Sequence, residues 1–452
     1  MSEAGRELVD QPLRRFKPYP AYRDSGVAWL GEIPTHWEVK RISELMTLVN
    51  GFPFDSEHFV RGDGVPLVRI RDLYATETEV NYTGPIVENA WIETGDVIIG
   101  MDGDFNVGRW RGSRALLNQR MCCLRARSRT NAGFVTYLLP APLRIINDLT
   151  YSTTVKHLSS NAVRKIRLGS PPLPEQRAIA GFLDRETARI DALVAKKERL
   201  IELLREQRTA LITRAVTKGL DQTVPMKDFG VEWLGEIPAH WEVKRLKHLL
   251  VAAKGAIKTG PFGSQLQSSE MQAGHIKVYN QRSVIDRDFS GGENYVSLEK
   301  FAELRAFETF PGDLLITTRG SIGRCAVLPD DAERGILHPC LMRVQSDQRR
   351  ILTRFLEIQI EEAAIVLDQL RFMSNATTID VIYSESLREV WLTLPPLMEQ
   401  AAIAAFLDRE TARIVALVAK VRDAIERLKE LRTALISAAV TGKIDVREEV
   451  SA

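Results

Sequence analysis

Residues 171–221 read PPLPEQRAIAGFLDRETARIDALVAKKERLIELLREQRTALITRAVTKGLD, and residues 395–445 read PPLMEQAAIAAFLDRETARIVALVAKVRDAIERLKELRTALISAAVTGKID, so that 35 of 51 positions are identical. Apolar residues recur at spacings of three and four with Arg, Lys and Glu between them, which is typical of an amphipathic helix. Neither Gly nor Pro interrupts residues 182–218 or 401–441, and Gly219 and Gly442 stand where a glycine ends a helix. The pattern predicts two long helices, over 174–218 and 399–441.

Each predicted helix carries an apolar stripe that is longer than a compact domain of this size can cover. The stripe needs a partner, and we expect the two helices to pair with each other as an antiparallel coiled coil. The alternative is that each helix folds back on its own domain.

A second, shorter repeat lies upstream of each long one. Residues 26–41 read GVAWLGEIPTHWEVKR and residues 230–245 read GVEWLGEIPAHWEVKR. A block that is nearly identical in both halves cannot encode a difference between them, so we expect an architectural role. Its tryptophans are predicted to pack each entry segment against the base of a long helix: Trp29, Trp37, Trp233 and Trp241. The alternative is an aromatic platform on which bases stack.

The regions between the repeats, 46–170 and 250–394, share little sequence and read as α/β. Short β-branched runs bounded by Gly, Asp and Pro predict strands in both, among them VPLVRIRDL (65–73) and HIKVYNQRSV (275–284). Shared landmarks suggest two versions of one fold: GFPFDSEHF (51–59) parallels GPFGSQL (260–266), GDVIIGMDGDFNVGR (95–109) parallels GDLLITTRGSIGR (312–324), and TTVKHLS (153–159) parallels TTIDVIY (377–383). The expected fold class is a tandem of two α/β (α+β) domains, each followed by a long helix.

The composition excludes several classes of protein. No run approaches the length of a membrane span, and the first residues lack the apolar run of a signal peptide. The four cysteines form no C-x-x-C pair, and seven scattered histidines show no metal-ligand spacing, so we expect a reduced, cytoplasmic protein without structural zinc. The net charge of +2 indicates no partner by itself.

The distribution of charge is more informative than the total. Residues 105–129 contain seven arginines and no acidic residue. Arginines interleaved with Asn and Gln suit phosphate neutralisation and readout of base edges. The alternative is a solvated strand whose arginines point outward. The second variable region is nearly neutral as a whole, which weakens the case there.

Taken together, the two W-L-G-x-I-P-x-H-W blocks, the two P-P-L-x-E-Q openings, the long helices and the glycine landmarks resemble the specificity (S) subunit of type I restriction–modification enzymes. The resemblance covers residues 24–445. It departs from the family at 104–108, where Asp-Phe-Asn-Val-Gly stands in place of the Gly-Ser-Ile-Gly found at 320–323.

The resemblance implies a chain that binds double-stranded DNA at a bipartite, asymmetric site, one half per variable region. It also implies docking of two methyltransferase (M) subunits and of restriction/translocase (R) subunits, with no role for a membrane. S-adenosylmethionine, ATP and magnesium are expected in those partners and no cofactor in this chain. The expected organisation is a flexible N-terminal segment (1–23), target-recognition domain 1 (24–170), spacer 1 (171–221), target-recognition domain 2 (222–394), spacer 2 (395–445) and a C-terminal tail (446–452).

Candidate site residues follow from the basic, Asn- and Gln-bearing stretches and from the repeated helices. We assign DNA binding to Arg69, Arg71, Arg109, Arg111, Arg114, Gln119, Arg120, Lys258, Gln265, Asn280, Gln281, Arg282, Arg319 and Arg324. We assign the docking of partner subunits to Glu175, Gln176, Phe182, Glu399, Gln400 and Phe406.

No motif in the chain predicts catalysis. An adenine methyltransferase would need N/D-P-P-Y/F, but both Pro-Pro pairs are followed by Leu, and the G-x-x-x-x-G-K-[ST] loop of a translocase is absent. Asp102 and Asp104 would suit a metal-dependent nuclease, but a turn is the simpler explanation of both. The competing interpretation is a non-catalytic adaptor whose two α/β modules bind proteins. Such an adaptor should not show the salt-dependent retention on DNA that a DNA-binding protein shows.

Overall fold

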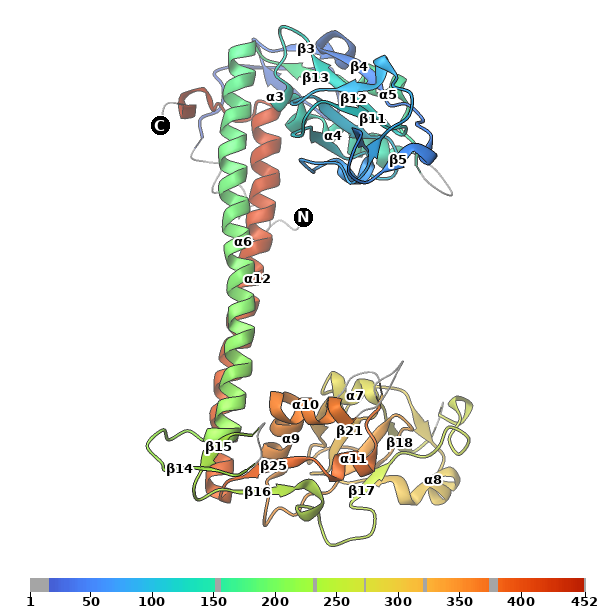
Figure 1. The fold of residues 1–452 in the computed structure, drawn as a ribbon, viewed down its shortest axis with the longest axis vertical. Helices are drawn as coiled ribbons and strands as arrows, with labels where there is room; N and C mark the ends of the chain where they lie inside the picture. The colour runs from blue at the N-terminus through green and yellow to red at the C-terminus, as the bar shows by residue number, and fades with distance from the viewer. Residues whose placement is uncertain are drawn as a thin grey trace. The chain divides into compact units, whose positions relative to one another are not determined.

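The computed structural model describes residues 16–150, 156–230, 234–271, 274–319, 323–373 and 381–450. The chain separates into two compact units, residues 1–198 with 422–452 and residues 199–421. Each unit holds one α/β domain together with a part of both long helices (Figure 1). The compact units therefore cut across the linear order of domains and spacers that the sequence suggested.

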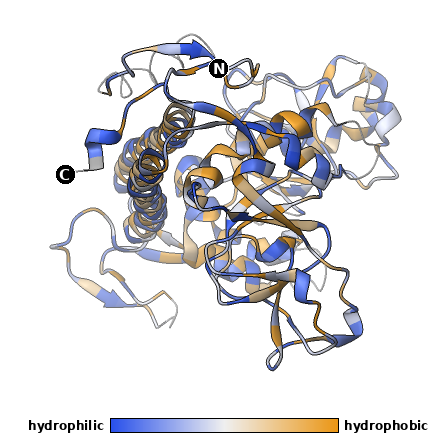
Figure 2. Cartoon of the chain, turned by 90° about the horizontal axis from the view of Figure 1, so that it is seen from above, coloured by the Kyte–Doolittle hydropathy of each residue, from blue (hydrophilic) through white to orange (hydrophobic). Residues whose placement is uncertain are grey.

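The two long helices are α6 (Leu173–Lys218) and α12 (Leu397–Val440). In the first unit the start of α6 lies beside the end of α12, where Arg432 Nε is 3.0 Å from Asp191 Oδ1. In the second unit the end of α6 lies beside the start of α12, and Ile212 shares a buried cluster with Leu407. Within each unit the helices are antiparallel, as predicted. Figure 2 views them nearly end-on and shows hydrophobic and hydrophilic residues around both.

The ends of the helices match the sequence signals. Pro174 is the second residue of α6, in the first turn, where its missing N–H removes no helical hydrogen bond. Gly219 has φ +73° directly after α6, and Gly442 has φ +71° just after α12. Glycine adopts this left-handed conformation without steric cost, so both residues end their helices as predicted.

The first domain is built on two sheets. The central sheet is antiparallel with strand order β10-β9-β12-β4, and a second, mixed sheet has the order β5-β7-β6-β11-β8. The strands of the central sheet are β4 (Met46–Asn50), β9 (Val97–Gly100), β10 (Val107–Arg109) and β12 (Met121–Ala126). Those of the second sheet are β5 (Phe59–Val60), β6 (Val65–Val68), β7 (Asn81–Tyr82), β8 (Trp91–Ile92) and β11 (Ala115–Leu117). The helices of this domain are α2 (Ile42–Leu45), α3 (Ala132–Leu138), α4 (Pro140–Leu149) and α5 (Ser160–Lys165).

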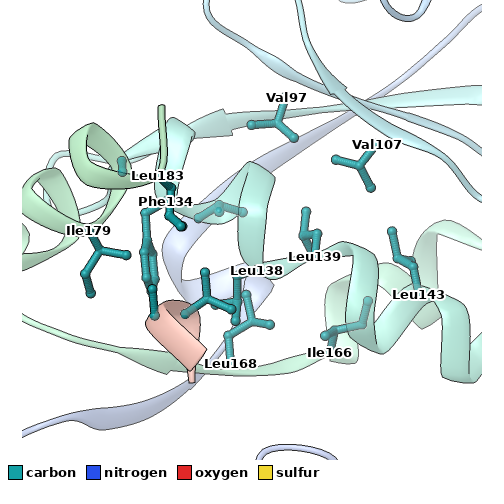
Figure 3. Close-up of a cluster of buried hydrophobic side chains, with 14 of the residues drawn as sticks. Val97, Val107, Phe134, Leu138, Leu139, Leu143, Ile166, Leu168, Ile179 and Leu183 are labelled. Atoms are coloured by element: carbon teal, nitrogen blue, oxygen red, sulfur yellow. The ribbon is translucent and has the colours of Figure 1, made fainter. Parts of the chain in front are cut away.

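The core of the first unit joins this domain to α6. Figure 3 shows buried side chains from the central sheet, from α3 and α4, and from α6 pointing into one cluster. Val97, Phe134, Leu143, Leu168 and Ile179 belong to it, and each is at most 2% exposed. Burial on this scale fixes the domain to the start of the helix.

The second domain repeats the topology of the first. Its central sheet has the order β17-β24-β21-β22 and its second sheet the order β19-β18-β23-β20. In both domains one parallel pair lies in the second sheet, β11 with β6 and β23 with β18. The strands are β17 (Ile257–Thr259), β18 (Ile276–Tyr279), β19 (Tyr295–Val296), β20 (Glu308–Thr309), β21 (Leu314–Thr317), β22 (Cys325–Val327), β23 (Gly335–Leu337) and β24 (Leu341–Val344). The helices are α7 (Gln281–Ile285), α8 (Leu298–Leu304), α9 (Thr353–Glu362), α10 (Ala364–Met373) and α11 (Ser384–Arg388). The prediction of two versions of one fold is confirmed.

Two predicted strands are shorter than the apolar runs suggested. The run 275–284 leaves the strand conformation after Tyr279 because Asn280 Oδ1 accepts hydrogen bonds from the N–H groups of Arg282 and Ser283 and starts α7. The run 65–73 likewise ends as a strand at Val68, and residues 70–72 form a 3-10 turn. Capping side chains therefore end both strands early.

Both chain ends need a correction where the structure describes them. Residues 16–23, which belong to the predicted flexible segment, are folded: Phe16 is 7% exposed, and Tyr19 is 3% exposed. The phenyl rings of Phe16 and Phe182 stack edge to face with centroids 5.4 Å apart. In the predicted tail, Val446 is fully buried in the same core. Residues 1–15 and 451–452 lie outside the described residues.

The short repeated block forms two small antiparallel pairs in each unit. β1 (Tyr22–Asp24) pairs with β2 (Glu32–Pro34), and β3 (Glu38–Arg41) pairs with β13 (Arg167–Ser170). In the second unit β14 (Met226–Asp228) pairs with β15 (Glu236–Pro238), and β16 (Glu242–Arg245) pairs with β25 (Trp391–Leu394). The repeated sequence thus ties the entry of each domain to the strand that leads into its long helix.

Trp37 and Trp241 are the buried centres of these blocks, with exposures of 1% and 0%. Trp37 Nε1 donates to Glu175 Oε1 at 2.9 Å, and its ring lies against Gly442. In the second unit Trp241 Nε1 donates to Glu399 Oε2 at 3.0 Å. Its ring lies against Gly219. Each indole is therefore held between the start of one long helix and the end of the other, which confirms the architectural prediction.

The other two tryptophans of the repeated block are not equivalent to these. Trp29 is half-buried and packs on the rim of the first core. Trp233 lies outside the described residues.

The four cysteines are all free, and burial raises the pKa of the Cys122 thiol to about 12. Among the described residues no helix is long and apolar enough to cross a membrane.

The packing at Gly442 predicts a large cost for Gly442→Ala. The new methyl would overlap Pro34, and the residue would keep its positive φ. We expect the free energy of unfolding to fall by about 1–2 kcal/mol because of the backbone conformation. Overpacking should lower it by about 1–3 kcal/mol more. Gly26→Ala is the matched control, since Gly26 has φ +67° and open space around the new methyl. Chemical denaturation of the full chain measures both, and equal losses would show that the contact between Pro34 and Gly442 is unimportant.

Candidate nucleic-acid interface

The central sheet of the first domain has one edge attached to α6. The backbone N–H of Asn131 donates to Gln176 Oε1 at 2.8 Å, and Gln176 Nε2 donates to the carbonyl of Arg129 at 3.3 Å. In the second domain Leu352 N–H donates to Gln400 Oε1 at 2.8 Å, and Gln400 Nε2 donates to the carbonyl of Arg350 at 2.9 Å. We call this the helix-attached edge.

The opposite edge of each central sheet consists of connecting segments, and we call it the loop edge. In the first domain it comprises 51–54, 69–71, 102–106, 118–120 and 156–157, and in the second domain 260–265, 280–282, 318–319, 338–340 and 381. In the two domains these segments lie next to equivalent strands. Loops on a rigid sheet are the usual location of recognition residues.

A close backbone approach shapes the loop edge identically in both domains. A side chain on Gly51 would overlap the carbonyl of Asn118, and a side chain on Gly260 would overlap the carbonyl of His338. Only glycine fits at such a contact. The two landmarks that the sequence aligned, beginning at Gly51 and Gly260, are therefore structurally equivalent.

The second shared feature of the loop edge is a backbone bridge. Asp102 pairs with His157 in the first domain, and Arg319 pairs with Val381 in the second. Leu158 N–H donates to the carbonyl of Met101 at 2.7 Å, and Ile382 N–H donates to the carbonyl of Thr318 at 3.0 Å. The backbone is conserved between the domains while the side chains that it carries differ in charge.

Most of the predicted DNA-binding residues lie at the loop edges. In the first domain these are Arg69, Arg71, Gln119 and Arg120; in the second they are Gln265, Asn280, Gln281, Arg282 and Arg319. Gln281 Nε2 donates to the carbonyl of Arg319 at 2.7 Å and so joins two of the second domain's segments. His338 lies next to them, and burial lowers the pKa of its ring, which keeps it neutral at pH 7.

Five predicted residues lie elsewhere. Arg109, Arg111 and Arg114 are at or beyond the other end of β10, by the helix-attached edge. Lys258 lies within β17 with Nζ 4.7 Å from the centroid of the Phe307 ring. Arg324 Nη1 is 3.2 Å from the buried carboxylate of Glu361. The structure thus divides the candidates between the two edges.

Acidic residues from outside the run 105–129 pair with three of its arginines. Glu93 lies 3.1 Å from Arg114, Asp96 lies 2.8 Å from Arg125, and Asp102 lies 3.2 Å from Arg120. The hydrogen bond to Asp96 raises the pKa of Arg125. All three acids precede the run in the chain and reach it through the folding of the sheets. Arg69 and Arg71 similarly share Glu79, and Arg282 pairs with Asp286.

Burial contradicts the docking role that we assigned to four of the six residues. Gln176 and Gln400 hold the helix-attached edges, and Phe182 is 2% exposed in the first core. Glu175 accepts hydrogen bonds from Tyr19 Oη at 2.7 Å, Trp37 Nε1 and His36 Nε2 at 2.9 Å. These side chains are occupied within the chain, so a docking partner cannot contact them. Glu399, with a 42% exposed side chain, and Phe406 retain accessible surface.

Sequence reasoning missed three residues of the loop edge: Asp102 as a partner of Arg120, and Asn118 and His157 as site residues. His157 lies in the TTVKHLS landmark, which the comparison of the two halves had found without assigning it a role. Within the described part of the chain no group of acids, histidines or cysteines is placed to hold a metal ion. Residues 153–155, 320–322 and 377–380 of the landmarks lie outside the described residues.

The two glutamates that begin the long helices predict unequal effects of substitution. Glu175→Gln removes a buried carboxylate that accepts hydrogen bonds from three side chains. We therefore expect the free energy of unfolding to fall by about 1–3 kcal/mol. Burial and the bond to Glu175 raise the pKa of Tyr19, which keeps the hydroxyl a donor. Glu399→Gln is the matched control in the second unit. Because water can reach this side chain, we expect the free energy of unfolding to fall by about 1 kcal/mol or less. Hydrogen exchange at the first turns of α6 and α12 measures both, and a larger effect at Glu399 would contradict this account.

Comparison with known proteins agrees with this architecture. The sequence model described as "Type I restriction modification DNA specificity domain" matches residues 34–203 and 238–427. The chain is 28% identical over 437 residues to the EcoBI specificity subunit of Escherichia coli, covering 93% of this chain and 89% of the relative. It is 21% identical over 449 residues to the EcoKI specificity subunit of Escherichia coli strain K12, covering 92% and 90%.

Solved structures share the fold at low sequence identity. A chain from a study of complex assembly and conformational transition of the type I R-M system superposes with a TM-score of 0.68 at 17% identity, covering 90% of this chain and 98% of that one. The HsdS subunit from Thermoanaerobacter tengcongensis superposes with a TM-score of 0.55 at 18% identity, covering 91% and 98%. With its family model matched in both halves, this chain belongs to the type I restriction modification DNA specificity family.

Proposed function

We propose that this chain is the specificity subunit of a type I restriction–modification complex and recognises a bipartite, asymmetric DNA site. Each domain reads one half of the site through its loop edge. The chain carries no active site of its own, and methylation and cleavage belong to partner M and R subunits with S-adenosylmethionine, ATP and magnesium. The relatives named as specificity subunits of type I restriction enzymes support this assignment.

One observation carries the proposal. The same scaffold occurs twice, with equivalent glycines at Gly51 and Gly260 and an equivalent backbone bridge, yet its loop edges carry different side chains. Two copies of one reader with different side chains are what an asymmetric site with two distinct halves requires. Arg, Asn and Gln are also the side chains that make paired hydrogen bonds to guanine and adenine in the major groove.

The arginines of the helix-attached edge have a separate role in this proposal. Arg109 and Arg111 are exposed, and we assign them to phosphate contacts of the first half-site. Arg114 is held by Glu93 and lies 4.2 Å from the centroid of the Trp91 ring, so it contributes less. Loss of one phosphate contact weakens binding to all sequences alike and reduces the salt slope by about one.

The test is to co-express the full chain with type I methyltransferase subunits from the same genome and to map methylated adenines in the host genome. We expect a motif of two specified halves separated by unspecified base pairs. Arg71→Ala should relax one position of one half-site, and Arg319→Ala one position of the other, each costing about 1–3 kcal/mol of discrimination. Arg111→Ala, at the helix-attached edge, is the control that should leave the motif unchanged.

Two results would contradict the proposal. Adenine methylation without a bipartite motif would exclude a role in recognition. Binding of the purified chain to DNA that is insensitive to salt, or absent with its partners present, would favour the adaptor interpretation.

A further inference from the structure

Three side chains meet at the loop edge of the first domain around one carboxylate. Asp102 Oδ1 accepts a hydrogen bond from His157 Nδ1 at 2.7 Å, and Asp102 Oδ2 accepts one from Arg120 Nη1 at 3.2 Å. The side chain of Asp102 is 14% exposed, whereas those of Arg120 and His157 are 66% and 61% exposed. The acid is thus the buried anchor, and the two basic side chains face solvent.

The backbone around this cluster is held in place by its own hydrogen bonds. Gly103 N–H donates to the carbonyl of Lys156 at 3.1 Å, and Asn147 Nδ2 donates to the carbonyl of Gly103. Lys156 Nζ in turn donates to the carbonyl of Asn147 at 2.7 Å. Contacts of this kind fix a binding side chain before its ligand arrives, which is what selective recognition requires.

Arg120 occupies a backbone conformation that is costly for an arginine. Its φ is +65°, in the left-handed region that favours glycine, and its carbonyl accepts the N–H of Met101 at 2.8 Å. Backbone strain at a non-glycine residue persists mainly where the side chain has a function. The exposed guanidinium has no packing role that would account for the choice of residue.

The second domain repeats the backbone hydrogen bonds of this cluster with different side chains at all three positions, and only the first domain has a positive φ at the position of Arg120. Thr318 N–H donates to the carbonyl of Cys340 at 2.9 Å, so Cys340 corresponds to Arg120. The bridge places Arg319 at the position of Asp102 and Val381 at the position of His157. Within the described part of the chain no carboxylate pairs with Arg319, whose side chain is exposed. Three equivalent positions therefore differ in charge, size and polarity.

We propose that these three positions determine the difference in base preference between the two half-sites, an inference that rests on the proposed function. In the first domain Arg120 donates its remaining N–H groups to the O6 and N7 acceptors of a guanine. Asp102 is a positioning residue that orients Arg120. His157 Nδ1–H donates a hydrogen bond to Asp102, which leaves Nε2 as the ring atom that forms a hydrogen bond with the neighbouring base pair. In the second domain Arg319 contacts the base at the equivalent position.

Arg120→Gly is the decisive variant because it removes the side chain and relieves the strained φ. The full chain in complex with its methyltransferase subunits is incubated with duplexes in which each position of the motif is varied in turn. We expect selectivity for one base pair of the first half-site to fall about ten- to a hundredfold. The melting temperature should be unchanged or higher, since glycine is favoured at this backbone conformation. The second half-site should stay as selective as in the wild type.

Asp102→Asn and His157→Ala complete the set, with Glu93→Gln as the control. Asp102→Asn should relax the same base pair as Arg120→Gly, and His157→Ala the adjacent one. Glu93→Gln breaks a comparable surface ion pair, with Arg114, away from the loop edge and should leave selectivity intact.

Unchanged selectivity in Arg120→Gly and Asp102→Asn, beside a wild-type complex that selects its motif, would overturn this inference alone. So would a change confined to the second half-site. A wild-type complex without any sequence preference would instead overturn the proposed function, and the inference with it.

Discussion

In each unit of this chain, a buried indole donates a hydrogen bond to a glutamate in the first turn of a long helix. Trp37 donates to Glu175 at the start of α6, and its ring packs against Gly442 just after α12. The same arrangement of indole, glutamate and glycine recurs with Trp241 and Glu399. One side chain thus fixes three segments that are far apart in the sequence. This constraint explains why the short block, the helix starts and the helix ends are all repeated together, because none of them can change without the other two.

The arrangement separates stability from specificity. The Trp–Glu contacts and the Gln176 and Gln400 contacts lie at the helix-attached edge. Equivalent positions that differ in charge, such as Asp102 and Arg319, lie at the loop edge. A sheet between the two edges keeps substitutions at the loop edge away from the core. Side chains such as Arg120 and Arg319 can therefore change without loss of the fold, which suits the proposed recognition of a different sequence by each half.

The features that the sequence predicted correctly are those encoded by local patterns. Helical periodicity and the glycines Gly219 and Gly442 located both long helices to within two residues, and the repetition of Trp37 as Trp241 identified an architectural block. The duplication itself predicted two copies of one domain. The matching orders of the central sheets confirmed it, and among the described residues the second sheets differ only by the additional edge strand β5.

The errors arose where a side chain's partner is remote in sequence. Gln176 and Gln400 bind backbone groups of the variable regions, and no motif marks a backbone partner. The run 105–129 looked uncompensated because Glu93 and Asp96 reach Arg114 and Arg125 only through strand pairing and turns. The predicted flexible N-terminal segment was wrong at Phe16 and Tyr19 because their partners, Phe182 and Glu175, lie more than a hundred and fifty residues later.

Hydrogen–deuterium exchange of the full chain with its methyltransferase subunits, with and without a duplex carrying its motif, tests the central claim most directly. We predict slower exchange in segments 102–106 and 118–120 of the first loop edge and in 318–319 and 338–340 of the second. The segments around Trp37 and Trp241 should exchange equally in both states. A duplex without the motif should protect the loop edges much less. Protection confined to the helix-attached edges, with the loop edges unaffected by the motif, would contradict the account.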